Sequence, residues 1–228
     1  MMSQIPVFFI PALLCDEALY SQVIEIMKNR VSVEVMMSPK AELADSCADI
    51  LARAPEKFVL VGTSYGGNLA LEIALAASER IKGLWAMGCD PGPPSAGTAD
   101  LASGLEATPA AVIDMLSGLV VRKTDTGSAT VFREMAHWVG GNAGAAQARA
   151  LSTRSDRTGR LQELAMPVLL TWGADDALVP PSVREMMAQK FPSATLHGLS
   201  DCGHLPTLEQ PQQAAALFSA FLEKLAVE

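Results

Sequence analysis

The chain has 228 residues, of which 50% are hydrophobic and 18% are charged, and its formal net charge is −8. This length suffices for one domain with a sizeable insertion but is short for two full domains, and the composition excludes a disordered chain. The negative charge repels phosphate groups and no Lys/Arg cluster opposes it, so we expect neither nucleic-acid binding nor docking on anionic lipid.

Targeting signals and metal-binding motifs are not evident in the sequence. The apolar start has no basic residue before Lys28, so we expect no signal peptide, and no apolar run approaches the roughly 20 residues that span a bilayer. The cysteines form no CxxC pair and the three histidines are far apart, so we expect no zinc site. We therefore expect a cytoplasmic protein with reduced thiols, no membrane partner, no metal and no organic cofactor.

Short apolar runs alternate with helical patterns along the first 90 residues. The predicted strands cover 7–10, 31–37, 58–61 and 81–87. Apolar residues spaced by three and four positions predict a helix after its N-cap Asp16, with Leu19, Val23, Ile26 and Met27 on its buried face, and a second helix near Leu43. A third helix is predicted over 65–78. This alternation favours a parallel sheet with helices on both faces.

The pattern changes after the proline-rich segment 90–94. Up to about Arg160 only helical patterns are found, with two amphipathic stripes: Val112, Met115, Leu116 and Leu119, then Phe132, Met135, Ala136 and Val139. Strands at 167–172 and 194–197 and helices at 183–191 and 212–226 follow. We predict an α/β protein with a mostly parallel sheet of about six strands, in which 1–90 and 161–228 form the core and 91–160 form a helical insertion.

A G-x-S-x-G motif, Gly62 to Gly66, lies between a predicted strand and a predicted helix. A sharp strand-to-helix turn would hold Ser64 in a strained conformation with its hydroxyl exposed, and the two glycines leave room for neighbouring backbone. The N–H of Tyr65 would lie at a helix N-terminus, where it can donate to an oxyanion. We therefore predict Ser64 as a nucleophile and Tyr65 as an oxyanion donor.

A serine nucleophile needs a base, and the chain offers three histidines. His137 lies in the helical insertion and His197 ends a strand. His204 lies in the loop between the last strand and the last helix, at the carboxyl edge of the predicted sheet, where sites in α/β proteins form. We therefore assign His204 as the base.

Three aspartates compete to orient this imidazole. Asp175 and Asp176 follow the strand at 167–172, and Asp90 follows the strand at 81–87. All three come at carboxyl ends of strands, but adjacent residues cannot both orient one histidine. We favour Asp176 and keep Asp90 and Asp175 as alternatives.

With these residues placed, the sequence resembles the α/β-hydrolase superfamily, in its short bacterial form with a small helical cap. The resemblance covers the chain outside the insertion, and five segments carry it: Phe8 to Asp16, Ala54 to Gly67, Glu79 to Leu84, Pro167 to Pro180 and Gly203 to Pro211. The order Ser64, Asp176, His204 is the family order. The family's aspartate is the third residue after a glycine, here Gly173, which selects Asp176 over Asp175.

The oxyanion loop departs from the family pattern. Pro11-Ala12 stands where the family usually has a His-Gly pair. By position, the resemblance assigns the second oxyanion donor to the N–H of Leu13. Since proline cannot donate and Ala12 has a Cβ that glycine lacks, we expect an altered oxyanion site.

The resemblance implies a serine hydrolase that acts on a small molecule through an acyl-enzyme, without a metal or cofactor. We expect a small to medium, largely apolar carboxylic ester or lactone, because the insertion offers apolar residues to a pocket. The predicted substrate contacts are Leu14, Met115, Leu119, Phe132 and Leu205. Arginines in and after the insertion could also meet a substrate carboxylate, although solvated side chains are the commoner case. These are Arg122, Arg133, Arg149, Arg154 and Arg157.

Three alternative functions remain open, since one scaffold hosts many chemistries. A C–C bond hydrolase of dienoic diketo acids and a thioesterase would use the same triad. A non-enzymatic small-molecule receptor on this fold is the third alternative, and an intact triad argues against it.

Overall fold

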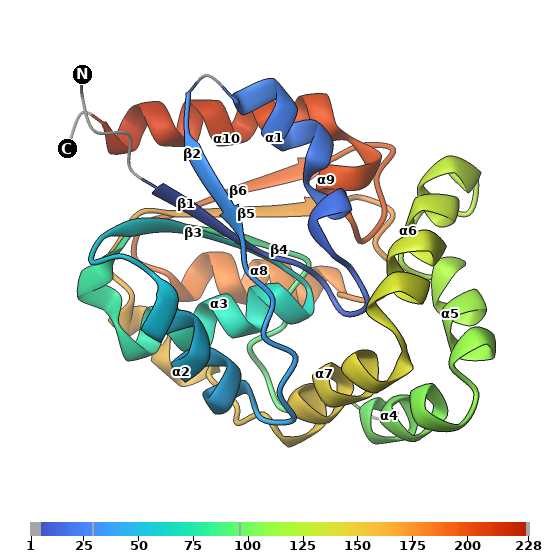
Figure 1. Cartoon of the computed structure of the whole chain (residues 1–228). Coiled ribbons are helices and arrows are strands. Elements are labelled where there is room, and N and C mark those ends of the chain that lie inside the picture. Colours follow the sequence, from blue (N-terminus) through green and yellow to red (C-terminus); the bar gives the residue numbers. More distant parts are fainter. Residues whose placement is uncertain (1–5, 29, 96, 227–228) are drawn as a thin grey trace.

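A six-stranded sheet forms the centre of the molecule in the computed structural model, which describes residues 6–28, 30–95 and 97–226 (Figure 1). Its order is β2-β1-β3-β4-β5-β6, and every neighbouring pair is parallel. The strands are β1 (Pro6–Ile10), β2 (Ser32–Val35), β3 (Phe58–Thr63), β4 (Ile81–Met87), β5 (Val168–Gly173) and β6 (Ala194–Leu199). The predicted α/β class is confirmed, with a sheet that is parallel throughout. Residues 1–5 and 227–228 of the predicted core, including the start of the apolar N-terminal segment, lie outside the described residues.

Helices cover both faces of this sheet (Figure 1). One face carries α1 (Ser21–Met27), α9 (Pro206–Glu209) and α10 (Pro211–Leu225), and the other carries α2 (Leu43–Arg53), α3 (Tyr65–Ala76) and α8 (Pro181–Lys190). Side chains of β3 alternate between the two faces: Val59 and Val61 pack in the core on the α10 side, and Phe58 and Leu60 in the core on the α3 side. Because both faces are covered, the central strands are apolar at nearly every position.

Four α-helices of the described residues are inserted between β4 and β5, beyond the carboxyl ends of the strands (Figure 1). We call α4 (Thr98–Ala107), α5 (Pro109–Ser117), α6 (Thr126–Val139) and α7 (Gly141–Thr153) the helical insertion. The two predicted stripes belong to α5 and α6. No stripe predicted α4 and α7, because these helices pack on each other through small residues, among them Ala102, Ala145 and Gly144. Small side chains allow a close helix approach but give a weak amphipathic pattern.

Three local predictions differ from the structure. The predicted strand at 31–37 is shorter, since β2 is a partly exposed edge strand of four residues. Asp16 caps a 3-10 turn, η1 (Glu17–Leu19), by accepting the Ala18 N–H at 2.8 Å, and does not cap α1. Ile26, placed on the buried face of that helix, is 50% exposed, because α1 is short and buries only Val23 and Met27.

No helix among the described residues is both long and apolar enough to cross a bilayer.

Candidate active site

Ser64 lies in a sharp turn between the end of β3 and the start of α3. Its φ of 56° and ψ of −115° form a strained backbone conformation for a residue with a side chain. A Cβ on Gly62 would come within 2.3 Å of the Gly66 carbonyl oxygen, and a Cβ on Gly66 within 2.0 Å of the Ile10 oxygen. The turn therefore requires glycine at both positions, and it lifts the Ser64 hydroxyl out of the sheet.

A chain of hydrogen bonds joins Ser64, His204 and Asp176. Ser64 Oγ lies 2.8 Å from His204 Nε2, and His204 Nδ1 lies 3.0 Å from each carboxylate oxygen of Asp176. The side chains of His204 and Asp176 are only 3% and 1% exposed. A hydroxyl that donates to an imidazole, which itself donates to a buried carboxylate, is the arrangement that activates serine for attack on a carbonyl.

Two further contacts orient the Asp176 carboxylate. Its Oδ1 accepts the N–H groups of Leu178 at 2.8 Å and Val179 at 3.1 Å. Burial raises the pKa of this carboxyl, but the hydrogen bond and charge of His204 and the two backbone N–H groups outweigh burial and hold the pKa below its usual value. Asp176 is therefore ionised wherever the protein is folded near neutral pH.

The other aspartates and histidines lie elsewhere. Asp175 is half-exposed and forms an ion pair with Arg122 at 2.9 Å. Asp90 accepts the Gly92 N–H at 2.9 Å and lines the cavity described below. His137 is exposed on α6, and His197 is partly buried in the edge strand β6. Among the described residues, Asp176 is the carboxylate that contacts His204.

Glu209, in α9, holds the loop that carries His204. Its carboxylate accepts the N–H groups of Gly203 at 2.9 Å and Leu205 at 3.1 Å, which flank His204, and that of Arg122 at 2.9 Å. The His204 N–H donates to the Val120 carbonyl oxygen at 3.2 Å. This loop is therefore fastened to the segment that joins α5 to α6. No role was predicted for Glu209, which lies within one of the segments that carry the family resemblance.

The predicted oxyanion donors, Leu13 and Tyr65, lie on two sides of Ser64. Tyr65 is the first residue of α3, so its N–H has no acceptor within the helix. Leu13 lies in the turn after β1, which is held by the Cys15 N–H donating to Ala12 at 3.0 Å and by the Leu14 N–H donating to Gln147 at 2.9 Å. Among the described residues neither the Leu13 nor the Tyr65 N–H has a protein acceptor. Gln147, a buried residue of α7, was not identified from the sequence.

A cavity of about 410 Å³ opens over Ser64 and His204, beneath the helical insertion. Phe132 and Leu205, two of the predicted substrate contacts, line it. Leu101, Leu116 and Val120 line it as well.

Leu14, Met115 and Leu119, the other three predicted contacts, lie outside the cavity. Met115 is 53% exposed because it lies beside, rather than on, the buried face of α5, and Leu119 is 40% exposed beyond the end of that helix. Leu14 is buried against Gly144 of α7, where an added Cβ would come within 2.5 Å of its Cδ2 atom. Helical spacing identified apolar residues but not the side from which the cavity is reached.

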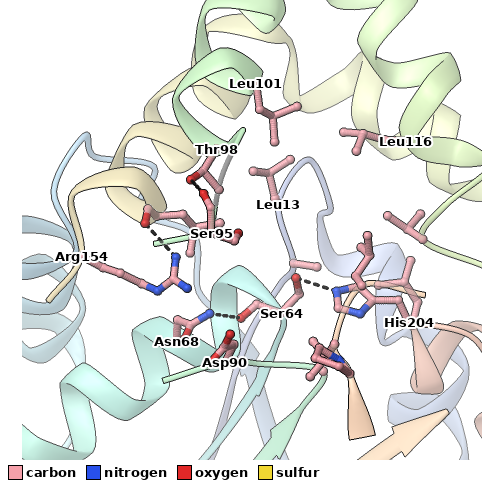
Figure 2. A pocket seen from close by; sticks show the side chains of 18 of the residues that line it. Leu13, Ser64, Asn68, Asp90, Ser95, Thr98, Leu101, Leu116, Arg154 and His204 are labelled. Atoms are coloured by element: carbon pink, nitrogen blue, oxygen red, sulfur yellow. Dashed lines mark hydrogen bonds between the residues drawn. The ribbon is translucent and has the colours of Figure 1, made fainter. Parts of the chain in front are cut away.

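Polar side chains gather on one side of the cavity in Figure 2. They come from α3, from the loop after β4, from the start of α4 and from the residue after α7: Asn68, Asp90, Ser95, Thr98 and Arg154. The Asn68 side-chain amide donates to the Ser64 carbonyl oxygen at 3.3 Å. Their positions are far apart in sequence, so only Asp90 and Arg154 had been considered for the site, Asp90 as an acid and Arg154 as a carboxylate partner.

Comparison with known proteins identifies one matching family and several solved structures of similar fold. The model of a family described as "Alpha/beta hydrolase family" matches residues 37–217, well over half of the chain. A thermophilic esterase from Thermogutta terrifontis is similar in structure, with a TM-score of 0.87 and 22% identity over 98% of this chain and 91% of that one. An enol-lactonase from Burkholderia xenovorans has a TM-score of 0.88 at 14% identity, covering 97% and 92% of the two chains. A meta-cleavage product hydrolase from Pseudomonas fluorescens has a TM-score of 0.80 at 20% identity, with coverage of 97% and 92%.

Proposed function

The chain belongs to the alpha/beta hydrolase family, and we propose that it is a serine hydrolase that cleaves small to medium, largely apolar carboxylic esters or lactones through an acyl-enzyme. The observation that carries this proposal is the buried hydrogen-bonded chain from Ser64 through His204 to Asp176, whose serine end opens into a mainly apolar cavity. The hydroxyl, the base and the cavity are thus in one place.

In the first half of the reaction, Ser64 Oγ attacks the ester carbonyl carbon and His204 Nε2 takes the hydroxyl proton. The ionised Asp176 stabilises the imidazolium that forms and keeps Nδ1 as the donor. The carbonyl electron pair moves onto the oxygen, which accepts hydrogen bonds from the N–H groups of Leu13 and Tyr65. When the tetrahedral intermediate collapses, the bond to the leaving alcohol breaks and His204 returns the proton to that oxygen.

In the second half, water replaces the alcohol. His204 removes a proton from the water as it attacks the acyl-enzyme, and the proton then passes to Ser64 Oγ when the acyl bond breaks. The products are the free acid and the starting enzyme. Each proton that His204 takes up is therefore released again within the same reaction cycle.

We also propose that the helical insertion acts as a cap, within a division into a core of residues 1–90 and 161–228 and a cap of 91–160. Three observations support this role: the insertion supplies Leu101, Leu116 and Phe132 to the cavity, Gln147 holds the turn beside Leu13, and the Val120–Arg122 segment holds the His204 loop. A cap of this kind limits the access of water to the site.

The decisive experiment compares wild type with Ser64→Ala on nitrophenyl esters of increasing chain length. We expect ester turnover by wild type and a loss of about 10⁴-fold or more in kcat for Ser64→Ala. Ser21→Ala, which changes an exposed serine of α1, is the matched control and should retain wild-type turnover.

Two further substrates in the same experiment distinguish the alternative functions from the proposed one. An acyl-CoA thioester and a dienoic diketo acid test the thioesterase and C–C hydrolase alternatives with the same variants. Wild-type turnover in Ser64→Ala would contradict the assigned nucleophile. If a fluorophosphonate labels no residue and no substrate is hydrolysed, the receptor alternative replaces the hydrolase.

A further inference from the structure

The cavity has two chemically different parts. We call Asn68, Asp90, Ser95, Thr98 and Arg154 its polar end. In Figure 2 Arg154, Asn68 and Asp90 lie on one side of Ser64, and His204 lies on the other. Most of the remaining lining is apolar, including Leu116, Val120, Phe132 and Leu205. A ligand that fills this cavity therefore meets apolar surface along most of its length and charge at one end.

Arg154 is fixed in place but is not neutralised by an ion pair. Its side chain donates to the carbonyl oxygens of Gly92 at 3.1 Å, Leu151 at 2.8 Å and Pro93 at 3.1 Å. A guanidinium has five N–H donors, so three neutral acceptors leave two donors unused. No carboxylate of the described residues forms an ion pair with Arg154. The side chain is partly buried, so this preoriented cation lines the cavity with donors to spare.

Asp90 limits which anion fits. It lines the same end, and its carboxylate accepts the Gly92 N–H and acts on Arg154 through its charge without forming an ion pair with it. A second negative charge close to Asp90 is repelled. A singly charged carboxylate, which takes two parallel N–H donors from a guanidinium, therefore fits better than a dianionic phosphate.

The direction of the reaction decides which part of the substrate reaches the polar end. His204 Nε2 must give its proton to the leaving oxygen, so the leaving alcohol lies on the His204 side of Ser64. The acyl group then extends to the other side, where Arg154 lies (Figure 2).

We propose that the polar end binds a carboxylate carried by the acyl part of the substrate, with Arg154 as its charge partner. This inference rests on the proposed function and narrows it to esters whose acyl chain ends in a carboxylate, such as monoesters of dicarboxylic acids. The apolar walls contact the methylene chain, and the guanidinium selects the far end.

The test uses nitrophenyl monoesters of dicarboxylic acids from succinate to pimelate, each paired with the same ester after methylation of its free carboxylate. Nitrophenol release is followed after subtraction of the uncatalysed rate. For at least one chain length we expect wild-type kcat/KM to be about tenfold or more higher for the anionic member of the pair, as for a charge-assisted hydrogen bond. The butyrate ester of a hydroxybenzoate, with its carboxylate on the alcohol side, should show no such preference over its methyl ester.

Three variants locate the preference. Arg154→Met should lower the anionic-to-neutral ratio to about one, whereas Arg149→Met should keep it, because Arg149 is a partly exposed residue of α7 that pairs with Glu106. Asp90→Asn should raise the ratio by removing a repelling charge. The ratio is used because it cancels any general loss of activity, and Asp90→Asn keeps the test decisive if Arg154→Met fails to fold.

The outcomes separate this inference from the proposed function. Turnover of the methylated esters without an anionic preference, or a preference that survives Arg154→Met, overturns the carboxylate site and leaves the serine hydrolase standing. A lower ratio in Asp90→Asn also overturns it. If wild type hydrolyses neither member of any pair, the proposed function itself fails.

Discussion

Each of the three hydrogen-bonded side chains of the site is held by contacts of its own. Ser64 is held by a strained turn between two glycines that no other residue can replace without a clash. Asp176 is held by two backbone N–H groups, and His204 by the loop that Glu209 fastens. The geometry is therefore preorganised before any substrate binds, which is what makes a hydrogen-bonded triad effective.

Asp176→Asn tests the residue that orients His204. The amide cannot stabilise an imidazolium and favours the wrong tautomer, so we expect kcat to fall by about 10³–10⁴-fold while KM changes little. The matched control is Asp175→Asn, which alters the adjacent half-exposed carboxylate and its ion pair with Arg122. Steady-state kinetics on one nitrophenyl ester would measure kcat and KM of both variants. A large loss of kcat in Asp175→Asn, with wild-type kcat in Asp176→Asn, would show that the wrong aspartate has been assigned.

The pH dependence of stability is a second property of Asp176. Its native pKa lies below the usual aspartate value of the unfolded chain, so folding favours the ionised form. The stabilisation is fully present above about pH 4 and is lost as the pH falls through the lower native pKa. The excess unfolding free energy of wild type over Asp176→Asn should therefore narrow from pH 7 to pH 3 in urea titrations. A difference that widens in acid would contradict this assignment.

At the scale of elements, α9 joins the two parts of the chain that meet at the site. Glu209 accepts N–H groups from the His204 loop and from Arg122, which follows α5, so one carboxylate links His204 to the helical insertion. Burial raises the pKa of Glu209, although its three backbone hydrogen bonds oppose that shift. A displacement of the insertion near Val120 would thus displace His204.

Glu209→Gln should weaken this link. The amide group places a donor against backbone donors and leaves at least one N–H unsatisfied, at a cost of about 1–3 kcal/mol of unfolding free energy. Because the base moves and the cavity walls do not, we expect kcat to fall about tenfold with a smaller change in KM. Glu223→Gln, on the exposed side of α10 where Glu223 pairs with Arg30, is the control. Equal losses in kcat and stability for both variants would show that Glu209 has no special role.

At the scale of the whole molecule, the fold buries all four cysteines, each in a different place, and three of them lie in the apolar layers on either side of the sheet. Cys47 lies in α2, Cys89 follows β4, Cys15 follows the turn after β1, and Cys202 precedes the His204 loop. Burial raises the pKa of the Cys47 thiol to about 11 and that of Cys89 to about 12, and it raises those of Cys15 and Cys202 as well. The thiols are therefore protonated and sheltered in the folded protein.

Alkylation of these thiols reports on the integrity of the whole fold. We expect iodoacetamide at pH 8 to react slowly with the native protein, with Cys47 first because it is the most exposed, and quickly with all four cysteines in guanidinium chloride. Mass spectrometry of intact and digested protein would show the order. Fast native labelling of Cys15, Cys89 or Cys202, with circular dichroism unchanged, would contradict the burial of these side chains.

The sequence by itself determined the class of the fold and the order of its elements. Continuous apolar runs separated by helical stripes indicated a parallel sheet. Strands that are buried on both faces are apolar at nearly every position, and the helices that cover them repeat apolar residues every three to four positions. The sharp turn at Ser64 could also be predicted from its glycines, since this turn involves only neighbouring residues. Helices α4 and α7 have many small residues and a weaker apolar periodicity, so their bounds were not predicted.

Only the tertiary structure decided which distant side chains meet. It brings one of three candidate aspartates to His204, turns Leu14, Met115 and Leu119 away from the cavity, and assembles the polar end from segments before and after the insertion. The physical reason is that periodicity records whether a residue is buried, not against what. The direction of a side chain within the core depends on the packing of elements far apart in the chain, which the pattern of one segment does not contain.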